Sequence, residues 1–172
     1  MENFRKALFL DRDGVINYDF GHVHEIKKFK FIDGIFDLGR FFQEKGFLII
    51  VITNQAGIAK SYYGHEDFSI LNEHMLDEFK KENILISKVY YCPHHEDFTG
   101  PCECRKPEPG MILEAAKEFK IDLSKSILIG DRLSDIGAAK NAGIGTSILF
   151  NSNMTSKIFL NFLKKVNKFD SE

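Results

Sequence analysis

The sequence predicts an α/β fold built on a doubly wound, mostly parallel sheet. Three observations predict it: five short apolar runs, longer amphipathic segments between them, and a length of 172 residues, which suits one domain. Apolar runs without polar alternation are typical of strands buried on both faces, as in parallel sheets. Strands that alternate with helices imply right-handed crossovers. We therefore expect a single domain over residues 1–172, with its core in about residues 6–150.

The predicted elements follow from the spacing of apolar residues. The expected strands span residues 7–10, 47–52, 88–91, 126–129 and 146–150. Helical spacing is found between them in three sets: Ile35, Leu38 and Phe42; Phe68, Leu71, Met75 and Phe79; Ile112, Ala116 and Phe119. Gly46 is expected to end the first helix and Asp67 to cap the second.

Two long connections and the C-terminal tail have other patterns. Residues 17–30 and 92–111 lack helical or strand periodicity, and loops of that length in a compact domain are usually functional. Residues 156–169 carry apolar residues on one side and lysines around them. This pattern favours a terminal helix docked on the domain over a helix on a membrane surface.

Charge and composition exclude several classes of protein. With 23 basic and 25 acidic residues, the net charge of −2 gives no general basic surface for nucleic acid. No apolar run approaches the ~20 residues of a membrane span, and the first residues lack the apolar region of a signal peptide. The three cysteines form a poor disulfide framework but a plausible metal cluster in a reducing compartment. We expect a soluble cytoplasmic protein without nucleic-acid or membrane partners.

Polar residues follow four of the five predicted strands. The sets are Asp11-Arg12-Asp13-Gly14, Thr53-Asn54-Gln55, Cys92, and Gly130-Asp131 with Asp135 nearby; Arg105-Lys106 lies in the second long loop. In doubly wound sheets, ligands bind at the carboxyl ends of the strands. A lone Asp-x-Asp more often closes a turn, but the joint occurrence of these sets favours a functional site.

These residue types suit phosphoryl transfer. One carboxylate can attack phosphorus, and a second can protonate the leaving oxygen and then activate water. A third completes an oxygen-rich site for Mg²⁺, which also offsets repulsion among the carboxylates. A hydroxyl, an amide and a lysine can neutralise the phosphoryl oxygens as charge builds up.

The cysteines suggest a second metal site. Cys92-x-His94 and Cys102-x-Cys104 offer three thiolates and one imidazole, a closed set suited to structural Zn²⁺. The alternative is two buried structural cysteines and one chance thiol. His22 and His24 lack a third ligand nearby, so we expect them in loop hydrogen bonds or at the surface.

The ordered motifs resemble those of the haloacid dehalogenase (HAD) superfamily of phosphatases. The residues that carry this resemblance are 8–14, 51–55, Lys106 and 129–131. Residues 21–25, 31–34, 54–59, 91–95 and 104–107 are further similar to the heptose bisphosphate phosphatases of that superfamily. The resemblance implies a HAD-like core without a separate cap domain, with loops 18–30, 55–65 and 92–105 shaping specificity in a monomer.

The resemblance also assigns roles to residues. It implies Asp11 as the nucleophile that forms an aspartyl-phosphate and Asp13 as general acid and base. The Asp11 and Asp131 carboxylates and the Asp13 backbone carbonyl would hold Mg²⁺. The expected phosphate- and substrate-binding residues are Thr53, Asn54, Gln55, Lys106 and, for a second phosphate at the sugar C1, Arg105. The expected Zn²⁺ ligands are Cys92, His94, Cys102 and Cys104, with His95 outside the set.

Three alternatives stay open at this level. The main prediction is a phosphatase for the C7 phosphate of a heptose 1,7-bisphosphate, which supplies nucleotide-activated heptose for lipopolysaccharide core or capsule. A histidinol-phosphate phosphatase would share the acidic motifs and the cysteine cluster. A zinc-stabilised binding protein without turnover is a hypothesis of another class. Asp135 either orients Lys106 or caps the helix that follows it.

Overall fold

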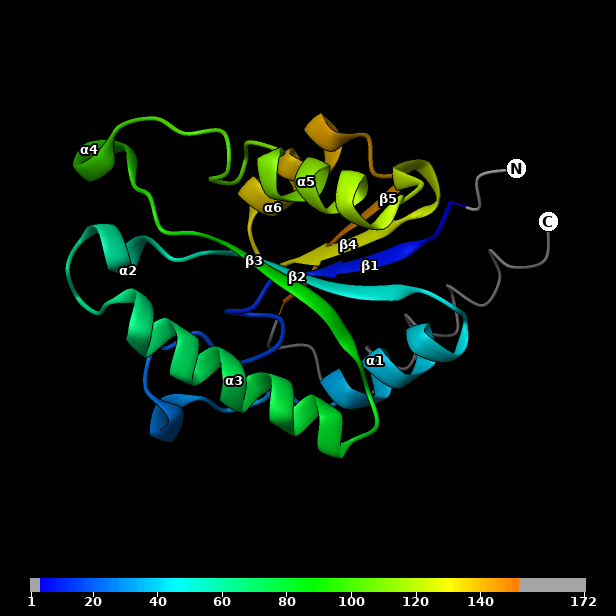
Figure 1. Ribbon diagram of the computed structural model, residues 1–172, viewed down its shortest axis with the longest axis horizontal. Helices are drawn as coiled ribbons and strands as arrows, with labels where there is room; N and C mark the ends of the chain where they lie inside the picture. The colour runs from blue at the N-terminus through cyan, green and yellow to red at the C-terminus, as the bar shows by residue number, and fades with distance from the viewer. Residues whose placement is uncertain (1–3, 152–172) are drawn as a thin grey trace.

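A five-stranded sheet forms the centre of the molecule in the computed structural model, which describes residues 4–151 (Figure 1). Its strands are β1 (Ala7–Leu10), β2 (Leu48–Asn54), β3 (Ile86–Cys92), β4 (Ile127–Gly130) and β5 (Thr146–Leu149). They lie in the order β3-β2-β1-β4-β5, and every neighbouring pair is parallel. The prediction of a doubly wound α/β sheet is confirmed.

Four helices cover the two faces of the sheet. Figure 1 shows α1 (Ile35–Glu44) and α3 (His65–Lys81) on one side, and α5 (Gly110–Phe119) and α6 (Leu133–Ala142) on the other. Short helical turns lie in the connections: η1 (Ile26–Lys28), α2 (Ala56–Ala59), α4 (Glu96–Thr99) and η2 (Leu123–Lys125). The long connections of the sequence are thus mostly irregular, as expected.

Each face of the sheet has its own core because successive strand residues point to opposite faces. In β1, Leu8 and Leu10 belong to the cluster under α1 and α3, whereas Ala7 and Phe9 belong to the cluster under α5 and α6. All four side chains are fully buried. Burial on both faces explains why the strand sequence is continuously apolar.

The predicted helix ends are partly corrected. Gly46 follows α1 with a φ of +77° and donates its N–H to Gln43 O at 2.9 Å, as expected of a terminating glycine. Asp67 takes part in capping but not as the N-cap residue, since α3 begins at His65 with Gly64 as its N-cap. Asp67 is the third residue of that helix, and its carboxylate accepts the Gly64 N–H at 2.8 Å.

No helix within residues 4–151 combines the length and apolar character needed to cross a membrane. The terminal helix predicted over residues 156–169 lies outside the described residues.

Leu38→Ala tests the core under α1. Leu38 is fully buried there, so removing its methyl groups should lower the free energy of unfolding by about 2–5 kcal/mol. Ile70→Ala on α3 is the control, because Ile70 is 52% exposed and should change the value by less than about 1 kcal/mol. Urea denaturation followed by circular dichroism measures both, and equal losses would contradict the assigned core.

Candidate active site

A cavity of about 340 Å³ opens at the carboxyl ends of β1 and β2, beside the loop that precedes α5. Side chains from four separate segments meet there. The charged and polar residues lining it include Asp11, Asp13, Asp19, His22, Asn54, Gln55, Lys60, Arg105, Lys106, Arg132 and Asp135. The convergence of residues far apart in the sequence follows from the parallel sheet.

Lys106 is the buried centre of the cavity floor. Its Nζ lies 2.8 Å from Asp11 Oδ1 and 2.6 Å from Asp135 Oδ1, and it donates to Ile52 O at 3.0 Å. Asn54 holds the Lys106 backbone from both sides: Asn54 Oδ1 accepts Lys106 N–H at 3.0 Å, and Asn54 Nδ2 donates to Lys106 O at 3.1 Å. The ammonium therefore has a fixed position.

Asp135 fulfils both roles that the sequence left open. Its Oδ1 pairs with Lys106, while its Oδ2 accepts the backbone N–H of Arg132 at 2.9 Å, at the start of α6. Gly130 provides the space, since a Cβ there would lie 2.2 Å from Asp135 Cβ. One carboxylate thus joins the end of β4, α6 and Lys106.

Burial and neighbouring charges shift the pKa values of several side chains at this site. Burial raises the pKa of Asp11 to about 8, although the Lys106 charge opposes the shift. Burial acts to lower the pKa of Lys106, but Asp11 and Asp135 outweigh it and leave that pKa raised. Burial also raises the pKa of Asp131. Both carboxyls would ionise more readily beside a further cation.

The chemistry of this donor set fits a divalent metal ion. Oxygens of Asp11, Asp131 and Asp135 lie within 4.8 Å of one another. Asp131 Oδ1 is buried without a hydrogen-bond partner, as an oxygen reserved for a metal would be. Gly14, with a φ of +90°, leaves room for this carboxylate, because a Cβ there would lie 2.1 Å from Asp131 Oδ2. Carboxylate oxygens are the ligands that Mg²⁺ prefers.

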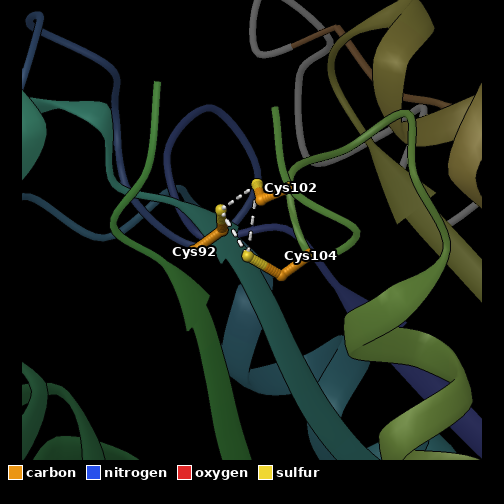
Figure 2. A group of neighbouring side chains, drawn as sticks. All are labelled: Cys92, Cys102 and Cys104. Carbon is orange, nitrogen blue, oxygen red and sulfur yellow. Dashed lines mark hydrogen bonds between the residues drawn. The ribbon is translucent and has the colours of Figure 1, made fainter. Parts of the chain in front are cut away.

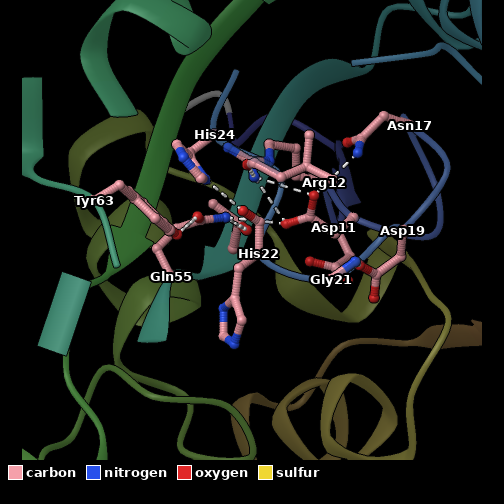
Figure 3. Close-up of polar contacts among 12 residues, drawn as sticks. Asp11, Arg12, Asn17, Asp19, Gly21, His22, His24, Gln55 and Tyr63 are labelled. Carbon is pink, nitrogen blue, oxygen red and sulfur yellow. Dashed lines mark hydrogen bonds and ion pairs between the residues drawn. The ribbon is translucent and has the colours of Figure 1, made fainter. Parts of the chain in front are cut away.

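Asp13 is held by Arg12 and Asn17, which are labelled in Figure 3 and which the sequence alone did not single out. Arg12 Nη2 lies 3.1 and 3.0 Å from the two Asp13 oxygens, and Asn17 Nδ2 donates to Asp13 Oδ1 at 3.0 Å. Arg12 is 1% exposed and also donates to Val23 O at 2.6 Å. Its position between the two aspartates was visible in the sequence, but its burial was not.

Gln55 was predicted to bind substrate, yet its amide is bonded to protein groups. Nε2 donates to Asp13 Oδ2 at 3.1 Å and to Thr53 Oγ1 at 2.8 Å, and Oε1 accepts the Tyr63 hydroxyl. Burial raises the pKa of Tyr63 to about 12, so its hydroxyl keeps the proton at neutral pH. Tyr63 was also missed, because nothing in its sequence neighbourhood marks it.

The cavity is lined by basic side chains from all three predicted loops. His22, Lys60 and Arg105 come from residues 18–30, 55–65 and 92–105, respectively. Arg105 Nη1 donates to His94 O at 3.2 Å, and Arg132 Nη2 lies 2.8 Å from Asp19 Oδ2. Lys60 was not predicted.

The histidines of the first loop are not part of a metal-binding group among the described residues. His24 Nδ1 lies 2.8 Å from His22 O, and its ring stacks on Tyr63.

The three cysteines converge between β3 and the loop before α5 (Figure 2). The sulfur of Cys104 lies 2.7 Å from that of Cys92 and 3.5 Å from that of Cys102, and the Cys92–Cys102 separation is 3.6 Å. Two of these separations are close to the about 3.7 Å expected between thiolates on tetrahedral zinc. His94 is not within this group, and His95 Nδ1 instead accepts the Asp97 N–H at the start of α4. The cluster can supply three zinc ligands.

Comparison with known proteins places the chain in a family. The HAD-hydrolase-like family profile matches residues 103–161. The chain is 54% identical to D-glycero-alpha-D-manno-heptose-1,7-bisphosphate 7-phosphatase of Campylobacter jejuni over 146 residues, covering 85% of this chain and 83% of the relative. The chain belongs to the D-glycero-D-manno-heptose-1,7-bisphosphate 7-phosphatase family of the HAD superfamily. A Haemophilus influenzae family member named for the beta anomer is 44% identical, with 85% and 79% covered.

A solved structure of this heptose bisphosphate phosphatase family shares the fold. D,D-heptose 1,7-bisphosphate phosphatase from B. bronchiseptica, complexed with magnesium and phosphate, has a TM-score of 0.75 and 29% identity. The match covers 82% of this chain and 78% of that one. That relative binds the metal and the anion that the donor set of this chain would suit.

Gly14→Ala tests the space beside Asp131. Its methyl group would overlap Asp131 Oδ2, so Mg²⁺ affinity should fall by about 10-fold or more. Gly143→Ala is the matched control, since Gly143 has a φ of +84° and nothing within 4 Å of a built Cβ. It carries the same backbone strain without touching the carboxylates. Isothermal titration with Mg²⁺ measures both, and equal affinities would contradict the assigned metal position.

Proposed function

We propose that the chain is a Mg²⁺-dependent phosphatase that removes the C7 phosphate of D-glycero-D-manno-heptose 1,7-bisphosphate. The observation that carries the proposal is the buried Asp11, paired with Lys106 and close to Asp131, on the floor of a cavity with a cationic rim. Its relatives in the family are named for this substrate. The geometry and the relatives support the same chemistry.

The reaction has two displacements at phosphorus. Asp11 Oδ1 accepts from Lys106, which leaves Oδ2 to attack the C7 phosphorus. As the bond from phosphorus to the sugar oxygen breaks, Asp13 gives that oxygen a proton, and an aspartyl-phosphate results. Asp13 then takes a proton from water, the water oxygen attacks phosphorus, and the bond to Asp11 breaks. Phosphate and heptose 1-phosphate are the products.

The remaining residues neutralise and place the phosphoryl group. We assign its oxygens to Lys106, which lines the cavity, and to Thr53, which Gln55 joins to Asp13. Asn54 acts through the Lys106 backbone that it holds. The Asp11 and Asp131 carboxylates and the Asp13 backbone carbonyl would hold Mg²⁺. When bound, that ion supplies positive charge against the charge that builds up on phosphorus oxygens.

Arg105 is proposed to bind the second phosphate, at C1. It lines the same cavity as Lys106 and can offer a bidentate guanidinium. Lys60 lines the cavity too and adds charge from a second loop. A bisphosphate would thus meet cations at both ends.

The cysteine cluster is proposed to hold a structural Zn²⁺ ion, with His94 as the fourth ligand beside Cys92, Cys102 and Cys104. Its support is the approach of the three sulfurs and the position of His94 two residues after Cys92. Arg105 follows Cys104 directly and bonds to His94 O, so this site would order the rim of the cavity.

Cys104→Ala tests the zinc proposal. Loss of one thiolate should remove bound zinc, lower the midpoint of thermal unfolding, and raise KM because Arg105 loses its support. Metal content is measured by plasma mass spectrometry beside unfolding and kinetics. Asp11→Asn is the control and should keep its zinc. Unchanged metal content, stability and KM in the Cys104 variant would refute the site.

Substrate and mechanism are tested by phosphate release with and without Mg²⁺. The panel contains both anomers of the heptose bisphosphate, histidinol phosphate and fructose 1,6-bisphosphate. We expect Mg²⁺-dependent release, fastest from a heptose bisphosphate, and a loss of about 10³-fold or more in Asp11→Asn.

Each outcome of this panel has a separate meaning. Release that survives Asp11→Asn would overturn the nucleophile. A preference for histidinol phosphate would keep the mechanism and change the substrate. No release from any substrate would favour a non-catalytic binding protein.

We further propose a cytoplasmic monomer whose product serves the synthesis of nucleotide-activated heptose for lipopolysaccharide core or capsule. The family relatives support this setting through the substrate in their names.

A further inference from the structure

Tyr63 is buried beside the active site, and the mechanism above does not use it. It is 8% exposed and follows α2 in the second loop of the cavity. We propose that Tyr63 is a positioning residue: its hydroxyl fixes the amide of Gln55, which aligns Asp13 and Thr53 for the reaction. This inference rests on the proposed function for its catalytic consequence, but its geometry stands apart from any substrate.

Three hydrogen bonds connect these residues, of which Tyr63 and Gln55 are labelled in Figure 3. Tyr63 donates its hydroxyl to Gln55 Oε1, and Gln55 Nε2 donates to Asp13 Oδ2 at 3.1 Å and to Thr53 Oγ1 at 2.8 Å. Gln55 is 2% exposed, so water has little access to compete for the amide. The amide thus bridges two residues with different tasks at the same phosphoryl group.

The hydroxyl completes the hydrogen bonds of the Gln55 amide. Gln55 Nε2 faces two oxygens, Asp13 Oδ2 and Thr53 Oγ1, so Gln55 presents its NH₂ group to them. Its Oε1 then points away and needs a donor, because a buried unpaired oxygen is costly. Tyr63 is that donor. Without the hydroxyl, Gln55 Oε1 loses the donor that it has in this structure, and the amide is held only through Nε2.

The ring is fixed in place from two sides. A Cβ at Gly57 would lie 2.1 Å from Tyr63 Cε1, so the ring occupies space that only glycine leaves open. The His24 ring stacks on the Tyr63 ring, with centroids 4.7 Å apart and an interplanar angle of 9°. Loss of the hydroxyl alone therefore leaves the ring and its packing unchanged.

Gln55 holds only one of the two carboxylate oxygens of Asp13. Asn17 bonds only to Oδ1, while Gln55 bonds only to Oδ2. Arg12 reaches both oxygens from a buried position. Release of Gln55 would let the Oδ2 side turn about the remaining contacts, and small misalignments of a proton donor slow catalysis.

Tyr63→Phe isolates the hydroxyl. We expect kcat to fall about 5- to 20-fold, the effect of one lost positioning hydrogen bond, while KM stays within about twofold. Tyr62→Phe is the matched control: it removes the same atom from a neighbouring side chain that is 60% exposed, and it should change neither constant. Thermal unfolding verifies that both variants are folded.

A double-mutant cycle tests whether Tyr63 acts through Gln55. Gln55→Leu should lower kcat, and Tyr63→Phe added to it should lower kcat no further. Multiplying effects would show that the hydroxyl acts directly on substrate and would overturn the proposal. An unchanged kcat in Tyr63→Phe, or a loss confined to KM, would overturn it too.

Nuclear magnetic resonance gives a readout that needs no turnover. The side-chain amide signals of Gln55 should shift in Tyr63→Phe and stay unchanged in Tyr62→Phe. Unshifted signals in Tyr63→Phe would refute the contact whatever the substrate is. If the proposed function fails, the wild-type protein releases no phosphate. The Gln55 signals still test the hydrogen bond to Tyr63, so the two failures can be told apart.

Discussion

The buried ammonium of Lys106 is the interaction on which the rest of the site depends. A buried charge is stable only when it is paired and fully hydrogen-bonded. Lys106 meets this condition with Asp11 from the end of β1, Asp135 from α6 and the carbonyl of Ile52 from β2. The same contacts that satisfy the charge therefore join three elements and the loop before α5. Removing either carboxylate would leave an unbalanced charge in the core.

The charges around Lys106 also explain why a divalent ion suits the site. The carboxyls of Asp11, Asp131 and Asp135 outnumber the one ammonium buried among them, and Arg132 Nε comes no nearer to Asp131 Oδ1 than 4.0 Å. Burial raises the pKa of Asp11 and of Asp131, so this excess is unfavourable without a further cation. Both carboxylate oxygens of Asp135 are already in contacts, Oδ1 with Lys106 Nζ and Oδ2 with the Arg132 N–H. Asp11 and Asp131 remain for the metal.

The sequence predicted the scaffold well because strand burial is a local property. Residues buried on both faces must be apolar throughout, and β1 and β2 show this directly. Polar residues directly after the apolar runs of β1 and β4 then indicated Asp11 and Asp131, and the long loop before α5 indicated Lys106. The position of Asp67 was not predicted because the N-cap residue of α3 is Gly64, which bears no capping side chain. Helix starts of this kind leave little trace in apolar spacing.

The contacts of Gln55 could not be predicted for a different reason. Its partners Asp13 and Tyr63 come from separate loops, and only the folded chain determines which polar groups face one another. Sequence spacing identified Gln55 as part of a motif, but an amide beside an active site can face a ligand or another side chain. Asp135 shows the same limit, since its two oxygens perform both of the roles that the sequence offered as alternatives.

Arg105 and Lys106 are neighbours in the chain, yet one lies at the cavity rim and the other in its floor. Consecutive Cα atoms are about 3.8 Å apart, so covalent geometry limits how far the two cations can separate. Asn54 anchors this peptide from both sides, which stops it from sliding along the cavity. Under the proposed function, the short spacing between the two cations restricts how far apart the two phosphates of one sugar can lie. Substrates would then be selected by the distance between their phosphates.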